Sequence, residues 1–587
     1  GMNTNFLTMA DPVNIERLEV IKGPSATLFG SSVISYGGLV NRVTKKPLNE
    51  FKGEVGYTIG SWNLNRLTAD LNTPLNNDKT VLLRTNIAWD NQNSWQDYGQ
   101  SKTQAVTAAL TYIVTPKFKI DFEVEHLNKK FNSTFYELLG NHKDYDWDFK
   151  KSYTSNDMLS TQKVTNFFAK ATYIISPKWT SETYLSSANT DFNTNYLFLS
   201  MNAPDVDRPG VQDSLSRDVT TINGAIKSTQ VQQNFTGNFN IGNVRNRLLV
   251  GLEYLNEYSD NLRWYTSYDM VKINDDPLYG NLPMFNYQTH LQNIANTPVN
   301  LNYVTNSETV SGYVSDVTNI TKNLILMASL RYSYYHDKDP LYGVEQGALS
   351  QKLGLVYQVV PKNVALFANY MNGYLNNYPA VTRESFPGVA RFKPEYANQL
   401  EGGVKFELFN GKVKGTLSYY DILVDNIVRP DPVDDTYSIQ DGSQRSKGFE
   451  ADVVATPFPG LNVIAGYGYN DNKYIKVYEE ALSGKRPAGV PRNVGNVWIS
   501  YRATNGALKN FGFGAGGNTQ SDFFFDDYNE VLLDGFTTFD ASIFYQAKKI
   551  RVGVKMNNIT DQQFWSSPRS AVPISPRQVL ANITLKF

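Results

Sequence analysis

The chain has 587 residues, more than one ordinary soluble domain holds, and it contains no cysteine and only four histidines. Disulfides, thiolate ligands and a cysteine nucleophile are thereby excluded, and a zinc or haem site built on clustered histidines is not expected. The 55 Lys and Arg residues nearly balance the 56 Asp and Glu residues, so net charge gives no indication of nucleic-acid binding.

The first predicted element is a compact, glycine-rich block from Ile15 to Pro47, "IERLEVIKGPSATLFGSSVISYGGLVNRVTKKP". Its "GPSATLFG" segment lacks the Gly-Lys-Ser/Thr ending of a phosphate-binding loop, and Lys22 precedes the segment instead of closing it. The block is therefore interpreted as a compact unit with tight turns. Its turn glycines, which supply unusual backbone dihedrals, are Gly23, Gly30, Gly37 and Gly38.

After this block the dominant period is two, which is typical of strands with one apolar and one polar face. No apolar run reaches about 18 residues, so no transmembrane helix is predicted, whereas a membrane β-barrel stays possible because each of its strands gives a weak signal. Strands are predicted to begin near residues 51, 62, 80, 102, 117, 161, 178, 227, 246, 306, 322, 348, 362, 394, 411, 446, 459, 492, 508, 535, 549 and 577.

The connections between these strands alternate in length. Short ones lie at 176–178, 242–246, 321–323, 361–363, 410–412 and 457–460. Long polar ones lie at about 129–160, 193–226, 260–305, 374–393, 426–445 and 473–491. A membrane barrel with tight turns at one end and long loops at the other has this rhythm, and a soluble propeller has no reason to show it.

The last predicted strand, "QVLANITLKF", places five apolar residues on one face, which would face lipid: Val579, Ala581, Ile583, Leu585 and Phe587. Its polar residues, Gln578, Asn582, Thr584 and Lys586, point the other way. The predicted fold is therefore all-β, an antiparallel transmembrane β-barrel of about 22 strands. A barrel this wide is associated with a plugged lumen, so residues 1–48 are interpreted as the C-terminal part of a truncated plug and residues 49–587 as the barrel.

The sequence resembles the TonB-dependent outer-membrane receptors, specifically their ferric-siderophore branch. "IERLEVIKGPSATLFG" followed by "GGLVNRVTKKP" is similar to the end of the family's plug domain. "QLEGGVKFELFNGKVKGTLSYYDI", "QRSKGFEADV", "GKRPAGVPRNVGNVW" and "VGVKMNNITDQQFW" are similar to barrel segments in the family's order. The family's plug is longer, and its first part carries the TonB box, which this sequence does not contain.

The resemblance implies a monomeric receptor that imports a ferric siderophore through the outer membrane of a Gram-negative bacterium. Energy would come through TonB, outer-membrane lipid would surround the barrel, and no nucleic acid would be involved. No cofactor or metal site is expected, because the iron would arrive already chelated. Two other functions stay open: uptake of another nutrient such as a glycan, a peptide or cobalamin, and a passive porin. An enzyme is not expected, because no base and nucleophile stand together.

Strand parity places Glu401 in "QLEGGVKFEL" and Glu450 and Asp452 in "GFEADVVA" on the lumen face. Such carboxylates can simply be solvated. The resemblance implies that Glu401 and Glu450 hold the plug through Lys22 and Arg17, and we call this predicted contact the latch.

A bulky chelate would suit stacked aromatic side chains in the long loops. The alternative interpretation for each aromatic is membrane girdle or loop core. By resemblance, Phe6 and Leu7 lie at the plug apex. The candidate ligand-binding residues are Phe6, Leu7, Trp264, Tyr265, Tyr374, Tyr378, Phe564 and Trp565.

Overall fold

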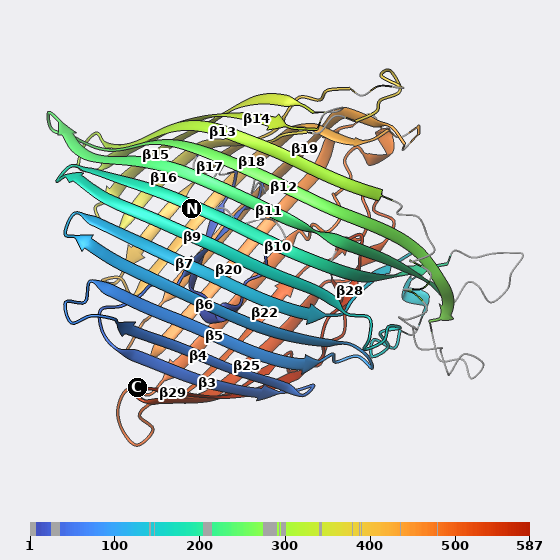
Figure 1. Ribbon diagram of the computed structural model, residues 1–587, viewed down its shortest axis with the longest axis horizontal. Coiled ribbons are helices and arrows are strands. Elements are labelled where there is room, and N and C mark those ends of the chain that lie inside the picture. Colours follow the sequence, from blue (N-terminus) through green and yellow to red (C-terminus); the bar gives the residue numbers. More distant parts are fainter. Residues whose placement is uncertain are drawn as a thin grey trace, which may run out of the picture.

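Alternating side chains make the chain from Lys52 onward a series of antiparallel strands that close into a barrel (Figure 1). The computed structural model describes residues 8–24, 27, 36–139, 142–145, 147–202, 214–273, 290, 292, 294, 301–339, 343–377, 380–386, 388, 390–431, 433–434, 436–477, 479–566 and 568–587. The predicted all-β barrel of about 22 strands is confirmed. None of the helices in this described part is long and apolar enough to cross a membrane.

Among the described residues, 22 strands form the ring, in which each pairs with its neighbours in chain order. They are β3 (Lys52–Gly60), β4 (Leu64–Pro74), β5 (Val81–Asn93), β6 (Gln100–Thr115), β7 (Phe118–Phe131), β9 (Ser160–Ser176), β10 (Trp179–Met201), β11 (Ser214–Ile241), β12 (Val244–Lys272), β13 (Leu301–Asn319), β14 (Leu324–Asp337), β15 (Glu345–Val360), β16 (Val364–Leu375), β17 (Glu395–Leu408), β18 (Val413–Pro430), β19 (Ser438–Ala455), β20 (Leu461–Lys476), β21 (Asn493–Arg502), β22 (Phe511–Gln520), β25 (Phe536–Gln546), β26 (Ile550–Asn557) and β29 (Gln578–Lys586). β29 closes the ring by pairing with β3, where Lys586 lies opposite Glu54.

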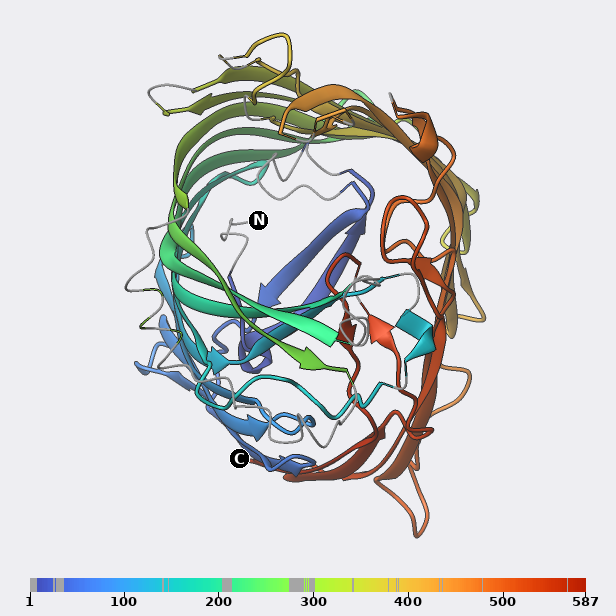
Figure 2. The ribbon, with the colours of Figure 1, turned by 90° about the vertical axis from the view of Figure 1, so that its right-hand side faces the viewer.

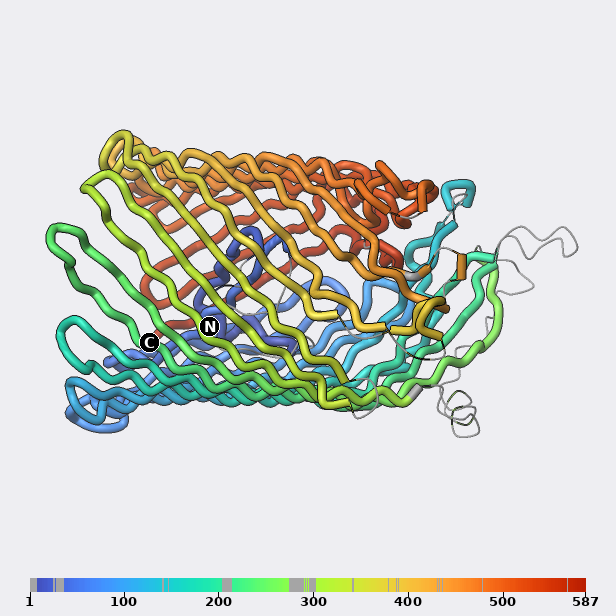
Figure 3. Tube along the Cα trace, turned by 90° about the horizontal axis from the view of Figure 1, so that it is seen from above, coloured from blue at the N-terminus to red at the C-terminus, as the bar shows by residue number. Residues whose placement is uncertain are grey.

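The strands slant across the molecule between two unlike ends (Figure 3). We call the end with the short turns the inner end and the end with the long connections the outer end, because membrane barrels have this asymmetry. Short elements at the outer end are β8 (Ser133–Glu137), η2 (His142–Asp144), η3 (Glu480–Leu482), β23 (Phe523–Phe524), β24 (Leu532–Leu533), β27 (Trp565–Ser566) and β28 (Val572–Pro573). β8 adds to the wall in parallel with the outer part of β10.

The exposure of β29 follows the predicted alternation. Val579, Ile583, Leu585 and Phe587 are exposed apolar residues. Between them, Lys586 forms an ion pair with Glu54 at 2.8 Å. This register places the apolar residues on the outer surface of the barrel, where lipid contacts it.

Three predicted long connections are wrong in extent. β18 continues to Pro430 and β19 begins at Ser438, within the predicted connection 426–445. β10 continues to Met201 and β11 begins at Ser214, within the predicted connection 193–226. β12 continues to Lys272 and β13 begins at Leu301, within the predicted connection 260–305. The extensions of β10 to β13 are rich in Thr, Asn and Tyr, and their polar side chains hide the alternation on which the prediction relied.

The N-terminal block lies inside the ring as a separate two-stranded sheet (Figure 2). After η1 (Pro12–Asn14), β1 (Ile15–Lys22) pairs antiparallel with β2 (Gly38–Thr44), so that Val20 faces Val40. We call these two strands the hairpin. The chain then reaches the wall at β3, so the end of the hairpin and the start of the barrel bracket the predicted plug boundary at residue 48.

Candidate functional site

The hairpin is positioned by glycine turns that bring its tip against the wall. Gly23 has φ of +77° and donates from its backbone N–H to the carbonyl of Gly37 at 3.1 Å. Gly38 has φ of +141°, and a Cβ there would lie 2.5 Å from the carbonyl oxygen of Ile21. Both positions therefore need glycine. Of the other predicted turn glycines, Gly37 lies in the same turn and Gly30 falls outside the described residues.

Lys22, at the end of β1, contacts two carboxylates of β19. Its Nζ lies 2.5 Å from Glu450 Oε2 and 2.7 Å from Asp452 Oδ2. Burial alone would lower the pKa of Lys22, but hydrogen bonds to Asp452 and Glu450 outweigh burial and raise that pKa above its ordinary value. Because all three side chains are partly exposed, this contact is worth about 0–1 kcal/mol.

Arg17 and Glu401 do not join this contact in the described part of the chain. Arg17 pairs with Glu19 on its own strand at 2.6 Å. It lies about 16 Å before Lys22 along an extended strand and on the opposite face, because the two positions differ in parity. Glu401 lies on β17, two strands away from β19, and accepts a hydrogen bond from Gln399 at 3.3 Å.

A denser contact, which the sequence reading missed, joins the hairpin to β7. Arg42 donates from Nη1 and Nη2 to the two oxygens of Glu125 at 3.0 and 2.9 Å. Asn14 donates to both Glu123 and Glu125, at 3.0 and 3.1 Å. Asn166 of β9 also donates to Glu125, at 3.0 Å. Both carboxylates are buried, so every one of these hydrogen bonds replaces lost hydration.

The same side of the hairpin is tied to β4 and β5. Lys45 Nζ lies 2.8 Å from Asp70, which also receives a bidentate pair of hydrogen bonds from Arg84. Before β1, Asp11 accepts from Arg66 at 2.6 and 3.0 Å. We call these contacts of the N-terminal segment, from Asp11 to Lys45, with β4, β5 and β7 the anchor. The alternation of side chains in "DFEVEHL" and "TADL" places Glu123, Glu125 and Asp70 on the lumen face. The sequence could therefore have indicated these carboxylates, but not their partners.

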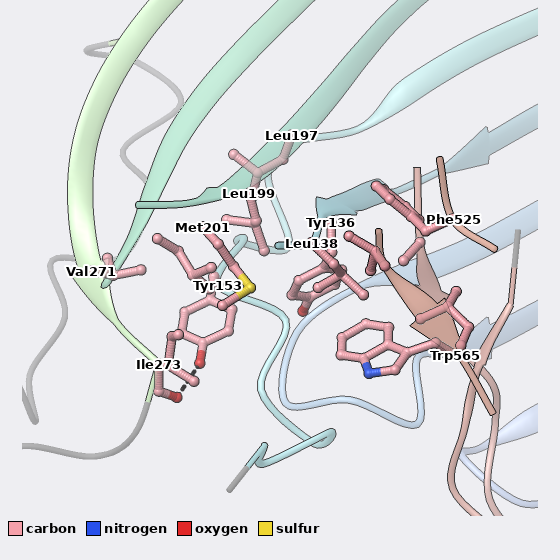
Figure 4. Packing of buried hydrophobic residues seen from close by; sticks show 14 of the residues in the cluster. Tyr136, Leu138, Tyr153, Leu197, Leu199, Met201, Val271, Ile273, Phe525 and Trp565 are labelled. Atoms are coloured by element: carbon pink, nitrogen blue, oxygen red, sulfur yellow. Dashed lines mark hydrogen bonds between the residues drawn. The ribbon is translucent and has the colours of Figure 1, made fainter. Parts of the chain in front are cut away.

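At the outer end, loops far apart in the sequence pack into one apolar cluster, which we call the cap (Figure 4). The ring of Trp565 meets that of Tyr136 with centroids 5.0 Å apart, and the Tyr136 backbone bridges to Ala571. Tyr153 donates to the carbonyl of Ile273 at 2.6 Å. The cap thereby connects the segment after β7, the outer part of β12 and the segment before β29.

His142 lies beside this cap, on a segment whose Leu139 and Trp147 pack against it. It is buried, its Nδ1 lies 3.0 Å from the carbonyl oxygen of Leu139, and its own carbonyl accepts from Trp147 Nε1 at 2.7 Å. Burial, the largest effect, lowers the pKa of His142 below its ordinary value of 6.5. Its neutral form is therefore the one that fits the cap.

The predicted ligand-binding aromatics do not form one group. Phe564 stacks on Phe536 with ring centroids 3.9 Å apart and lines a cavity of about 430 Å³. Trp565 belongs to the cap core, and Tyr374 is fully buried in the wall. On β12, Trp264 is half-buried and Tyr265 is exposed. Phe6, Leu7 and Tyr378 lie outside the described residues.

No group of three or more His, Cys, Asp or Glu residues in the described ranges is placed to hold a metal ion. The described site therefore consists of a hairpin held inside a barrel by ion pairs, beneath an aromatic cap.

Residues 49–559 match the family model described as TonB dependent receptor-like, beta-barrel. The chain is 25% identical to the metal-pseudopaline receptor CntO of Pseudomonas aeruginosa, over 100% of this chain and 82% of that protein. It is 22% identical to the ferrichrome outer membrane transporter/phage receptor of Escherichia coli, over 98% of this chain and 79% of that protein.

Two solved structures have a similar fold. The ferric preacinetobactin receptor BauA of Acinetobacter baumannii matches with a TM-score of 0.84 and 17% identity, over 98% of this chain and 86% of that one. The ferripyoverdine receptor of Pseudomonas aeruginosa, bound to ferripyoverdine, also matches with a TM-score of 0.84, at 19% identity, over 99% and 77% of the two chains.

Proposed function

Because the chain belongs to the TonB-dependent receptors, which lie in the outer membrane of Gram-negative bacteria, we propose that it imports a metal–siderophore complex actively into the periplasm. The family consists of transport receptors, and relatives of this chain are receptors for ferric siderophores and metal complexes. The ligand would bind at the outer end from outside the cell, and TonB would supply the energy through contact with the plug.

The observation that carries this proposal is the hairpin inside the ring. A lumen of 22 strands is too wide for wall side chains to fill, and in this chain the N-terminal block occupies it. In its described residues, the block is held by side-chain contacts and not by strand pairing with the wall. Such contacts allow release without breaking the barrel, which an energised importer needs and a passive porin does not.

Growth under iron limitation tests the ligand class. A deletion strain, supplied with single ferric chelates, should lose growth on one chelate class and regain it when the gene is restored. The same loss should follow deletion of tonB. Normal growth on every chelate, together with a defect on a glycan, a peptide or cobalamin, would support the alternative nutrient instead.

Conductance in a planar lipid bilayer tests the passive porin. The purified protein should conduct little, because the N-terminal block obstructs the lumen. A variant that lacks residues 1–48 is the matched control and should conduct more. A large, steady conductance of the whole chain would contradict the plugged receptor.

A further inference from the structure

Phe564 marks a cavity at the outer end of the barrel that has a polar floor. The cavity, about 430 Å³, lies against β22, β25, β26 and β29. Paired strands supply the lumen-facing floor: Asn518 lies opposite Thr538, and Asn557 lies opposite Gln578. Asn557 donates to Gln578 at 3.1 Å, while its own Oδ1 is buried and meets no donor among the described residues. The paired amide and hydroxyl side chains give this floor both hydrogen-bond donors and acceptors.

Aromatic and proline side chains form the other side of this cavity. The Phe536–Phe564 stack, with planes 14° apart, lines this side together with the buried Phe523. Gly489 has φ of +77°, and a Cβ there would lie 2.4 Å from Pro568 Cγ. This close approach brings the loop before β21 against the loop before β29. The result is a partly open cavity of mixed polarity whose volume falls within the range of small-molecule sites.

The charge of the cavity limits what it can bind. Among the described residues that line it, Asp540 is charged and no Lys or Arg occurs. Asp540 itself lies 3.8 Å from Lys555 Nζ and accepts from the backbone N–H of Asn558 at 2.9 Å. A ligand with several negative charges would lose hydration here without meeting a cation, which is costly.

A second cavity of about 330 Å³ continues from the first toward the hairpin. The two share Asn518, Gln520 and Phe536, and the second reaches Lys22, Glu450 and Asp452. Opposite those carboxylates, β20 carries glycines: Gly468 faces Glu450, and Gly466 faces Asp452. Side chains of the next strand pack over these glycines, since a Cβ at Gly466 would lie 2.6 Å from Asn496 Oδ1 and a Cβ at Gly468 would lie 3.3 Å from Val494 Cγ2. Lys22 is already paired with both carboxylates, so this end of the path is also not positive.

We propose that the two cavities form one ligand track for an uncharged or positively charged metal chelate of the hydroxamate type, in preference to an anionic catecholate. Three singly charged hydroxamates cancel the charge of Fe(III), whereas three doubly charged catecholates leave the complex strongly negative. Asn and Gln side chains can donate to hydroxamate oxygens and accept from amide N–H groups. The aromatic side covers the apolar linkers of such a chelate. This assignment rests on the proposed uptake of a metal–siderophore complex.

The test measures binding to the purified full chain in detergent by ultrafiltration with radioactive iron. The probes are the iron(III) complexes of a linear tris-hydroxamate and of a tris-catecholate. The variant Thr538→Trp places a ring in the first cavity, and we expect it to weaken hydroxamate binding by about tenfold or more. Thr537→Trp is the matched control, because Thr537 is the preceding residue of β25 and points to the opposite face.

A second pair keeps the test independent of how well a buried tryptophan is tolerated. Thr538→Lys should shift the preference from the hydroxamate toward the catecholate complex, and Thr537→Lys should not. Tighter catecholate binding by the unmodified chain, or equal binding by the Thr538 and Thr537 variants, would overturn the track while leaving metal–siderophore uptake standing. Failure of the unmodified chain to bind any metal chelate would overturn both.

Discussion

Arg42 of the hairpin and Glu125 of β7 form a bidentate ion pair whose side chains are 19% and 10% exposed. Lys22 and Glu450, on the other side of the hairpin, are 43% and 30% exposed. Water screens the second pair more than the first, so β7 holds the hairpin more strongly than β19 does. We expect it to leave β19 before it leaves β7, opening the lumen on the side of the proposed ligand track.

Removing the carboxylates that face Lys22 should loosen one end of the hairpin alone. The double variant Glu450→Gln/Asp452→Asn should speed hydrogen exchange around Gly23, while the barrel's thermal unfolding changes by no more than about 1 kcal/mol. Glu182→Gln is the control, since Glu182 of β10 is also a partly exposed carboxylate but pairs with Lys170 of β9 instead of Lys22. Unchanged exchange at Gly23 in the double variant would show that these pairs do not hold the hairpin.

Breaking the anchor should cost more. Glu125→Gln leaves Arg42 poorly paired in a mostly buried site, and we expect local destabilisation of about 3 kcal/mol, seen as faster exchange of the β2 amides. Adding Arg42→Met removes the stranded charge and should recover part of that loss. If Glu125→Gln affects exchange no more than Glu450→Gln does, the unequal hold inferred above is wrong.

The barrel could be predicted because alternation is local. The strand predicted near residue 577 begins at Gln578, and the one predicted near 51 begins at Lys52. The outer extensions of β11 and β12 were not predicted, because polar residues on both faces of the strands leave no alternation to detect there. Pairing between neighbouring strands, not a local pattern, keeps them extended.

The candidate site was only half predictable for a related reason. The alternation of side chains along the strand placed Glu450 on the lumen face, and the family resemblance selected Lys22 as its partner. The structure places these two side chains in contact. Nothing local in the sequence relates Arg42 to Glu125, which are 83 positions apart. The pairing depends on how the hairpin is set inside the ring, and that follows from the sum of many contacts.

The register of β29 predicts that an introduced charge destabilises the barrel to different extents at two adjacent residues. Ile583→Arg places a charge on the lipid face and should cost about 2–4 kcal/mol if the side chain stands near the membrane midplane. Asn582→Arg, on the lumen face, is the matched control and should cost far less. Unfolding by denaturant in lipid vesicles measures both, and equal costs would contradict the register in which Asn582 lies opposite Gly553.

His142 predicts that the cap loosens in acid. Its pKa is lowered in the folded cap by burial, so the unfolded segment binds a proton more readily than the folded one. Stability is therefore complete above the ordinary pKa of 6.5 and falls as pH drops from there toward the lowered value. Limited proteolysis of residues 139–152 should be faster at about pH 5 than at about pH 7.5. His142→Gln cannot take up this proton and should be cleaved at similar rates at both pH values. Acid-accelerated cleavage that persists in that variant would assign the effect to another group.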